Sequence, residues 1–112
     1  MSNNNLAPDG FNFIQESHGI NEYNLKSNGL RVLTLSDRSA PVATFMVTYH
    51  VGSRNEAIGY TGSTHLLEHL MFKGSRNFNK EKGTAIWDEL QSIGAQINAT
   101  TWNDRTNYLS LI

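Results

Sequence analysis

Two histidines and one glutamate stand close together in the sequence HLLEH at residues 65–69. On an α-helix each residue advances by about 100°, so His65, Glu68 and His69 lie on one face of the helix. Two imidazoles one turn apart can both reach a single Zn²⁺ ion at about 2.0–2.1 Å. The spacing therefore predicts a zinc site on one face of a short helix.

Glu68 lies beside the two histidines but is better placed for a water molecule on the metal than for the metal itself. Zn²⁺ lowers the pKa of such a water to about 7, and a neighbouring carboxylate can take its proton as it attacks a carbonyl carbon. H-x-x-E-H is also the inverted form of the zincin metallopeptidase signature. The motif therefore predicts hydrolytic chemistry.

A pair of histidines on a short helix, such as His65 and His69, can also be a solvated surface feature, so the helical context decides the interpretation.

The two histidines outside the motif are interpreted differently. His18 sits in a polar stretch and His50 at the end of a predicted strand. Both are expected to be structural rather than metal ligands.

A short helix over residues 64–72 must carry the motif. Leu67, Leu70 and Met71 lie on its opposite face and are expected to point into a core. Residues 73–75 contain a glycine, the residue most favoured just past a helix end, and are expected to stop the helix.

Alternation of polar and apolar residues, together with turn residues, predicts the elements around this helix. An Asn-Gly turn at residues 27–29 predicts a hairpin. The predicted elements are strands at residues 22–26 and 30–36, a buried strand at 43–51, a loop at 52–64, a second helix at 80–93, and strands at 95–101 and 106–112.

The predicted order ββ–β–α–α–ββ indicates an α+β fold, with a mixed or antiparallel β-sheet covered by helices. Residues 1–20 open with an Asn-rich polar stretch and are expected to be a flexible lead-in. Residues 111–112 lie within an apolar strand pattern, so the fold is expected to be incomplete in this chain.

Composition excludes several classes of protein. The 112 residues include 38% hydrophobic and 17% charged residues, which argues against disorder and coiled coils. Nine Lys and Arg against ten Asp and Glu, with no basic cluster, argue against nucleic-acid binding. No apolar run approaches the roughly 20 residues that a membrane span needs. The absence of cysteine excludes disulfides and thiolate ligands.

The compartment is not determined by composition. The first residues lack a basic segment followed by an apolar run, so no secretory signal peptide is predicted. A cytoplasmic location is therefore favoured, and a periplasmic one stays open if a leader has been removed.

Two sequence blocks resemble the M16 family of zinc metallopeptidases, the pitrilysin or insulinase type. The first block is GSRNE at residues 52–56 followed by GSTHLLEHLMFKG at 62–74, and the second is NATTWNDRTNY at 98–108. The second block is similar to the family pattern N-A-x-T-x-x-D-x-T-x-Y. The resemblance implies that residues 21–112 are the N-terminal part of a catalytic domain of the LuxS/MPP-like metallohydrolase type.

The resemblance also implies roles for individual residues. His65 and His69 would be the zinc ligands, and Glu68 the general base that activates water. Asn98 and Ala99 would lie on an edge strand to which an extended peptide or unfolded polypeptide substrate adds by β-augmentation. Asn98 can also be interpreted as a structural residue of that strand.

Other residues of the two blocks are expected to serve the fold. Arg54 and Glu56 are expected to form a local ion pair near the site. Asp104, Thr106 and Tyr108 are expected to stabilise a turn and the strand that follows it.

The resemblance implies one zinc ion per complete active site, and that ion needs one more protein ligand than this chain supplies. A catalytic zinc site has three protein ligands, and the family's third ligand is a Glu about 75 residues beyond the second histidine. That position lies past residue 112, and nothing marks Glu81, Asp88 or Glu89 as a replacement. The implied partners are the remainder of the catalytic domain and a second M16-like half or subunit. The chain alone is therefore predicted to be inactive.

Two other functions remain open. The S-ribosylhomocysteine lyases share the H-x-x-E-H helix, but they take part of their chemistry from cysteine, which this chain lacks. A non-catalytic fragment or subunit that binds peptides or proteins is the other alternative.

Overall fold

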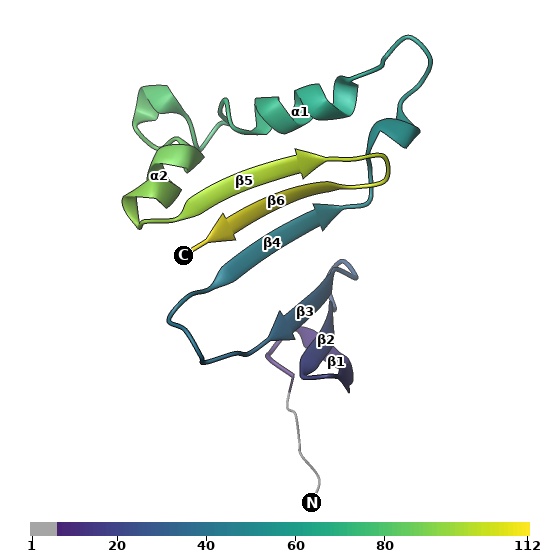
Figure 1. The fold of residues 1–112 in the computed structure, drawn as a ribbon, viewed down its shortest axis with the longest axis vertical. Helices are drawn as coiled ribbons and strands as arrows, with labels where there is room; N and C mark the ends of the chain where they lie inside the picture. The colour runs from purple at the N-terminus through teal and green to yellow at the C-terminus, as the bar shows by residue number, and fades with distance from the viewer. Residues whose placement is uncertain (1–6) are drawn as a thin grey trace, which may run out of the picture. The chain divides into compact units, whose positions relative to one another are not determined.

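The computed structural model describes residues 7–112 (Figure 1). The chain divides into two compact units, Met1–Pro41 and Val42–Ile112. Each unit holds one three-stranded antiparallel sheet, and both helices belong to the second unit. Neither helix of the described residues has the length and apolar character needed to cross a bilayer.

The first unit is a meander of β1 (Phe11–Ser17), β2 (Ile20–Leu25) and β3 (Arg31–Leu35). The predicted hairpin between β2 and β3 is confirmed. Its turn places Gly29 at φ +75°, and the Asn28 side chain accepts a hydrogen bond from the backbone N–H of Leu30 at 2.9 Å.

Strand β1 differs from the flexible lead-in that the sequence predicts for residues 1–20, of which residues 1–6 lie outside the described residues. Polar residues occupy both faces of β1, which hides the alternation of Phe11 and Phe13. In the structure, β1 ends at a turn in which His18 and Gly19 adopt φ values of +53° and +81°. Two successive positive φ values are typical of a tight hairpin turn.

The second unit contains a sheet in the order β4-β6-β5, with β6 in the centre. Its strands are β4 (Thr44–Tyr49), β5 (Gln96–Thr101) and β6 (Thr106–Leu111). Two helices, α1 (Ser63–Met71) and α2 (Ile86–Ser92), contact β5, and two short 3₁₀ helices are η1 (Ser53–Asn55) and η2 (Lys80–Lys82). The predicted α+β class with an antiparallel sheet and helices is confirmed (Figure 1).

The predicted second helix over residues 80–93 is wrong in its first half. The chain forms η2, then reaches Gly83 at φ +67°, and α2 begins only at Ile86. A left-handed glycine ends a helical turn, so the periodicity of residues 80–93 spans two separate elements.

Burial is also lower than the sequence predicted. Strand β4 forms, but Phe45 is 67% exposed, so the prediction of a buried strand is wrong. Leu67, Leu70 and Met71 lie on the outer side of α1 and are at least half exposed rather than in a core. Among the described residues Ala95 is the one apolar residue that is buried. Half or more of each of these side chains therefore stays uncovered by the described residues.

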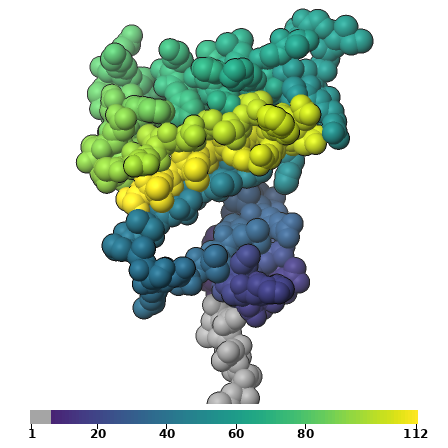
Figure 2. Space-filling model, viewed as in Figure 1, coloured from purple at the N-terminus to yellow at the C-terminus, as the bar shows by residue number. Residues whose placement is uncertain are grey.

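The two faces of the β4-β6-β5 sheet carry different residues. Tyr108 of β6 pairs with Ala99 of β5, and its ring packs against Phe72, which follows α1, at a centroid distance of 6.0 Å. Side chains alternate across a strand, so Ala99, Thr101 and Tyr108 share the face toward α1. Figure 2 shows β5 and β6 as a yellow-green band with the residues of the helical region directly beside it.

Candidate metal centre

Helix α1 begins in a network centred on Glu56. The N-cap residue is Gly62 at φ +89°, which has no side chain to accept a bond from the first backbone N–H groups. Glu56 accepts instead, from the Gly62 N–H at 3.0 Å, the Thr64 N–H at 2.8 Å and the Thr64 hydroxyl at 2.6 Å. The Ser63 hydroxyl adds a fourth bond at 3.3 Å. A carboxylate from the preceding loop therefore caps the helix.

The same contacts favour the charged form of Glu56. Hydrogen bonds from the Thr64 hydroxyl, then from the Thr64 and Gly62 N–H groups, lower the pKa of Glu56 from its ordinary 4.5 to about 2. The positive end of the helix dipole acts in the same direction. The expected ion pair between Arg54 and Glu56 is wrong, because Arg54 Nε instead contacts Asp104 Oδ1 at 3.0 Å.

The loop that leads to α1 is joined to the turn between β5 and β6. The Ser53 N–H donates to the Trp102 carbonyl at 3.0 Å, and the Arg54 N–H donates to the Asn103 carbonyl at 2.9 Å. At Gly52 a Cβ atom would lie 2.0 Å from the Trp102 oxygen, so only glycine allows this approach. The contacts fix the start of the loop to the end of β5.

The structural roles expected for Asp104, Thr106 and Tyr108 agree with their contacts. Asp104 pairs with Arg54, as described above. Thr106 is buried, and its hydroxyl donates to the Val51 carbonyl at 2.9 Å. Tyr108 packs between the ring of Phe72, which follows α1, and the ring of Tyr49 on β4. These residues hold the sheet and the loop together.

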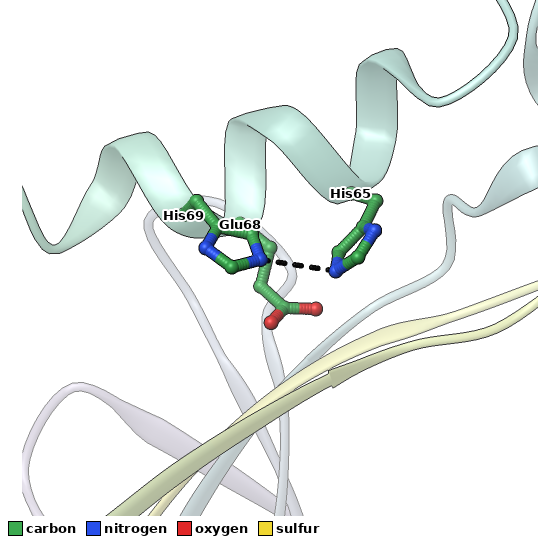
Figure 3. Close-up of side chains that lie close together, drawn as sticks. All are labelled: His65, Glu68 and His69. Carbon is green, nitrogen blue, oxygen red and sulfur yellow. Dashed lines mark hydrogen bonds between the residues drawn. The ribbon is translucent and has the colours of Figure 1, made fainter.

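The motif residues converge on the side of α1 that faces the strands, as Figure 3 shows. The Nε2 atoms of His65 and His69 lie 3.0 Å apart. The candidate ligand atoms of His65, Glu68 and His69 all lie within 4.8 Å of one another. Both histidines are exposed, whereas Glu68 is half-buried. Within residues 7–112 no other group of three metal-ligating side chains forms, so His18 and His50 stand outside the site.

The donor set fits a zinc ion. Two ligand atoms at about 2.0–2.1 Å from a tetrahedral zinc are separated by about 3.3 Å, close to the 3.0 Å between the two Nε2 atoms. Imidazole nitrogen is a ligand that zinc prefers, and both rings are accessible from solvent. Residues 65 and 69 therefore supply two ligands of a possible site, and a third would have to come from elsewhere.

Glu68 is held by a residue of the sheet. The Thr101 hydroxyl, at the end of β5, donates a hydrogen bond to Glu68 Oε2. Tyr108 also lies near this carboxylate. Burial raises the pKa of the Tyr108 phenol, and the charges of Glu68 and then of Tyr49 raise it further. A phenol that stays neutral therefore stands close to the Glu68 carboxylate.

Asn98 and Ala99 lie on β5, which has β6 as its one neighbour among the described strands. The Trp102 N–H donates to the Arg105 carbonyl at 2.8 Å and closes the hairpin. Backbone bonds alternate along an antiparallel pair, so the N–H and C=O groups of Ala99 and Thr101 point away from β6. The Ala99 N–H is instead bonded to Asn98 Oδ1 at 2.9 Å.

Sequence reasoning missed two residues of the site. The sequence predicts an ion pair of Glu56 with Arg54, whereas the structure pairs Glu56 with Thr64, eight residues further along the same loop and helix start. Thr101 was given no role, although it is the Thr of the N-A-x-T block. Only the docking of α1 against β5 brings Thr101 to Glu68.

Comparisons with known proteins agree with this geometry. The family model "Insulinase (Peptidase family M16)" matches residues 31–110. An uncharacterized zinc protease of Streptomyces coelicolor is 37% identical over 101 residues, which cover 88% of this chain and 21% of that protein. The probable mitochondrial-processing peptidase subunit beta of Arabidopsis thaliana is 39% identical over 85 residues, covering 76% of this chain and 15% of that protein.

Two further matches extend the comparison. Subunit 1 of the cytochrome b-c1 complex of Rattus norvegicus is 38% identical over 99 residues, covering 87% of this chain and 20% of that protein. The crystal structure of a protease from Helicobacter pylori superposes with a TM-score of 0.69 at 35% identity, covering 77% of this chain and 20% of that one.

The chain spans between 15% and 21% of the length of these relatives. The family model nevertheless covers well over half of its residues, including both sequence blocks and the His65, Glu68 and His69 cluster. The chain therefore belongs to the insulinase family of metallopeptidases, peptidase family M16.

Proposed function

We propose that this chain supplies two zinc ligands and the general base of a zinc-dependent endopeptidase. His65 and His69 are the ligands, and Glu68 is the base. The observation that carries the proposal is the convergence of the two Nε2 atoms, 3.0 Å apart, beside the Glu68 carboxylate. Relatives named as a zinc protease and as a processing peptidase subunit support it.

When bound, zinc supplies Lewis-acid chemistry, which polarises a carbonyl group and makes water more acidic. Glu68 accepts the proton of the attacking water and then donates it to the leaving amine, as a general base and acid in turn. A third zinc ligand, a Glu about 75 residues beyond His69, completes the site in a longer protein.

The proposed substrate is an extended peptide or an unfolded polypeptide that adds to β5 as a further strand. The backbone groups of Ala99 point away from β6, so its carbonyl can pair with a peptide, and its N–H can do so when it exchanges its bond to Asn98 Oδ1. Asn98 contributes its side-chain amide at the same place. An added strand here passes close to Glu68, because Thr101 at the end of β5 contacts that residue.

The proposed partners are the rest of the catalytic domain and a second M16-like half or subunit. The names of the relatives favour such an assembly, because they describe a subunit beta and a subunit 1. A second half would enclose the peptide bound on β5.

A non-catalytic binding subunit is the second candidate function. It is favoured by the similarity to subunit 1 of the cytochrome b-c1 complex, whose name describes a component of a complex rather than a peptidase. This alternative needs neither zinc nor Glu68, so hydrolysis by the wild-type protein and its loss on substitution of Glu68 distinguish the two functions.

Glu68→Gln in the full-length protein tests the proposal. The amide is nearly isosteric but accepts no proton at neutral pH, so hydrolysis of an unstructured peptide should fall roughly 10²–10⁴-fold. Zinc content should stay unchanged, because Glu68 is not a ligand. Turnover is measured by fluorogenic peptide cleavage, and zinc by elemental analysis.

Two results would contradict the mechanism. Unchanged turnover would mean that another group is the base, and loss of zinc would make Glu68 a ligand. If the wild-type full-length protein binds peptides but hydrolyses none, the binding-subunit alternative holds. Glu89→Gln, an exposed change on α2, is the matched control.

A further inference from the structure

We propose that Thr101 is the positioning residue for the general base, and that it couples the peptide-binding strand to that base. Its hydroxyl holds the Glu68 carboxylate, and its backbone groups lie on the strand edge where a peptide would add. This inference rests on the proposed function of Glu68. It assigns a role to a residue that contacts the base rather than the metal.

The first observation is the hydrogen bond between the two elements. Thr101 Oγ1 donates to Glu68 Oε2 across 33 residues of sequence, and both residues are half-buried. Thr64, Glu68 and Phe72 are half-buried at intervals of four residues, so they mark the side of α1 that packs on the sheet. Glu68 therefore emerges from the packed side of the helix, where its position can be controlled.

The second observation concerns the freedom of the carboxylate. A glutamate has several rotatable bonds, and a base acts only within hydrogen-bond reach of the proton it takes. One bond to Oε2 restrains the side chain, and proton transfer can use Oε1. Threonine suits this task, because its branched Cβ restricts χ1 and so fixes the direction of the hydroxyl.

The third observation is the place of Thr101 on β5. It forms a non-hydrogen-bonded pair with Thr106, because the hairpin closes one residue later through Trp102 and Arg105. Its own N–H and C=O therefore point away from β6, as those of Ala99 do. A peptide paired with β5 would meet the backbone of the residue whose side chain holds the base.

A purely structural bond between α1 and β5 would affect stability alone. A positioning role also affects kcat, while KM and zinc content stay constant. The two roles can therefore be separated by kinetics on the full-length, zinc-loaded protein.

The experiment compares Thr101→Val, which keeps the shape but removes the hydroxyl, with Thr101→Ser, which keeps the hydroxyl. We expect Thr101→Val to lower kcat about 10–100-fold with KM within about twofold, because a small misplacement of a reacting group is costly. Thr101→Ser should recover most of the loss. Thr48→Val, an exposed change on β4, should leave kcat unchanged.

A second pair covers the case in which Thr101→Val does not fold. Thr101→Ser and Thr101→Ala both lack the methyl group and differ only in the hydroxyl. The proposal requires kcat of the serine variant to exceed that of the alanine variant by at least about 10-fold. Equal kcat values for the two would overturn it, as would full turnover in Thr101→Val.

A measurement on the metal-free full-length protein tests the bond without activity. Thr101→Val and Glu68→Ala remove the two ends of one interaction, so together they should lower the melting temperature by less than the sum of their separate effects. Additive effects would mean that the bond does not form. If Glu68→Gln keeps full turnover, the proposed function fails instead, whatever the coupling between the two residues.

Discussion

His65 and His69 carry the proposed metal site at the scale of single residues. Their Nε2 atoms converge from successive turns of α1, and both rings are open to solvent. We expect His65→Ala or His69→Ala in the full-length protein to abolish stoichiometric zinc, because either change leaves a site with too few ligands. Zinc is measured by elemental analysis after dialysis against a weak chelator.

His18→Ala and His50→Ala are the controls for this prediction. Both residues lie outside the cluster, and His18 instead contacts the Ser17 hydroxyl at 2.8 Å. Zinc content should be unchanged in both variants. Tight zinc that survives the loss of His65 would show that the ligands have been assigned wrongly.

The sequence reveals the site residues that are local and misses those that depend on packing. His65, Glu68 and His69 share one face because of helical spacing alone, so their convergence could be predicted. The bond from Thr101 to Glu68 depends on how α1 lies against β5, which no spacing rule gives. Arg54 pairs with Asp104 rather than Glu56 for the same reason, because the loop folds back on the β5–β6 turn.

At the scale of elements, the position of α1 depends on a cap supplied by the loop before it. Glu56 accepts four hydrogen bonds from residues 62–64, and its pKa is about 2. Because this pKa is lowered in the folded state, the stabilisation is complete above the ordinary value of 4.5. It is lost as the pH falls from 4.5 toward 2.

Glu56→Gln should therefore loosen the start of α1. A glutamine has one acceptor oxygen instead of two. Its NH₂ group would face the N–H and hydroxyl donors of residues 62–64 and could not accept from them, so part of the cap is lost. We expect faster hydrogen exchange at the Gly62 and Thr64 amides, measured by NMR on the full-length protein. The variant should also lose less stability than the wild type between pH 4.5 and 2.

Glu81→Gln is the control, since Glu81 is an exposed acidic residue of η2, outside the cap of α1. Its exchange rates at Gly62 and Thr64 should match those of the wild type. Unchanged protection of both amides in Glu56→Gln would show that the carboxylate does not cap the helix.

The elements differ in how well their sequences predict them. Strands β5 and β6 combine clear alternation with a short polar turn, and both form as predicted. The periodicity of residues 80–93 suggested one helix, yet Gly83 divides it, because a left-handed glycine outweighs weak helical spacing. Strand β1 escaped prediction because its tight turn begins at His18, and a residue other than glycine is uncommon at positive φ.

At the scale of the whole molecule, the fold class and family follow from the sequence, but the degree of burial does not. Residues 43–51 have the composition of a buried strand, yet Phe45 and Met46 remain exposed. Composition records which side chains are suited to burial, whereas burial itself requires a second layer. Relatives about five times as long have room for such a layer.

These exposed side chains predict how residues 1–112 behave when produced alone. Leu67 and Leu70 on α1 and Phe45 on β4 are at least half exposed, and β4 and β5 are edge strands among the described residues. Open edges and apolar patches favour association. The net charge of −1 provides little repulsion against it. We expect concentration-dependent self-association in sedimentation velocity and strong binding of a hydrophobic dye.

The double change Leu67→Gln and Leu70→Gln should reduce both signals, because it removes apolar surface from α1 at two positions that are at least half exposed. Thr48→Gln, a polar change at an exposed position on β4, is the matched control and should leave association unchanged. A monomer at all concentrations that unfolds cooperatively would contradict the prediction. It would mean that these apolar side chains find partners within the 112 residues, and that burial in solution is greater than the structure gives.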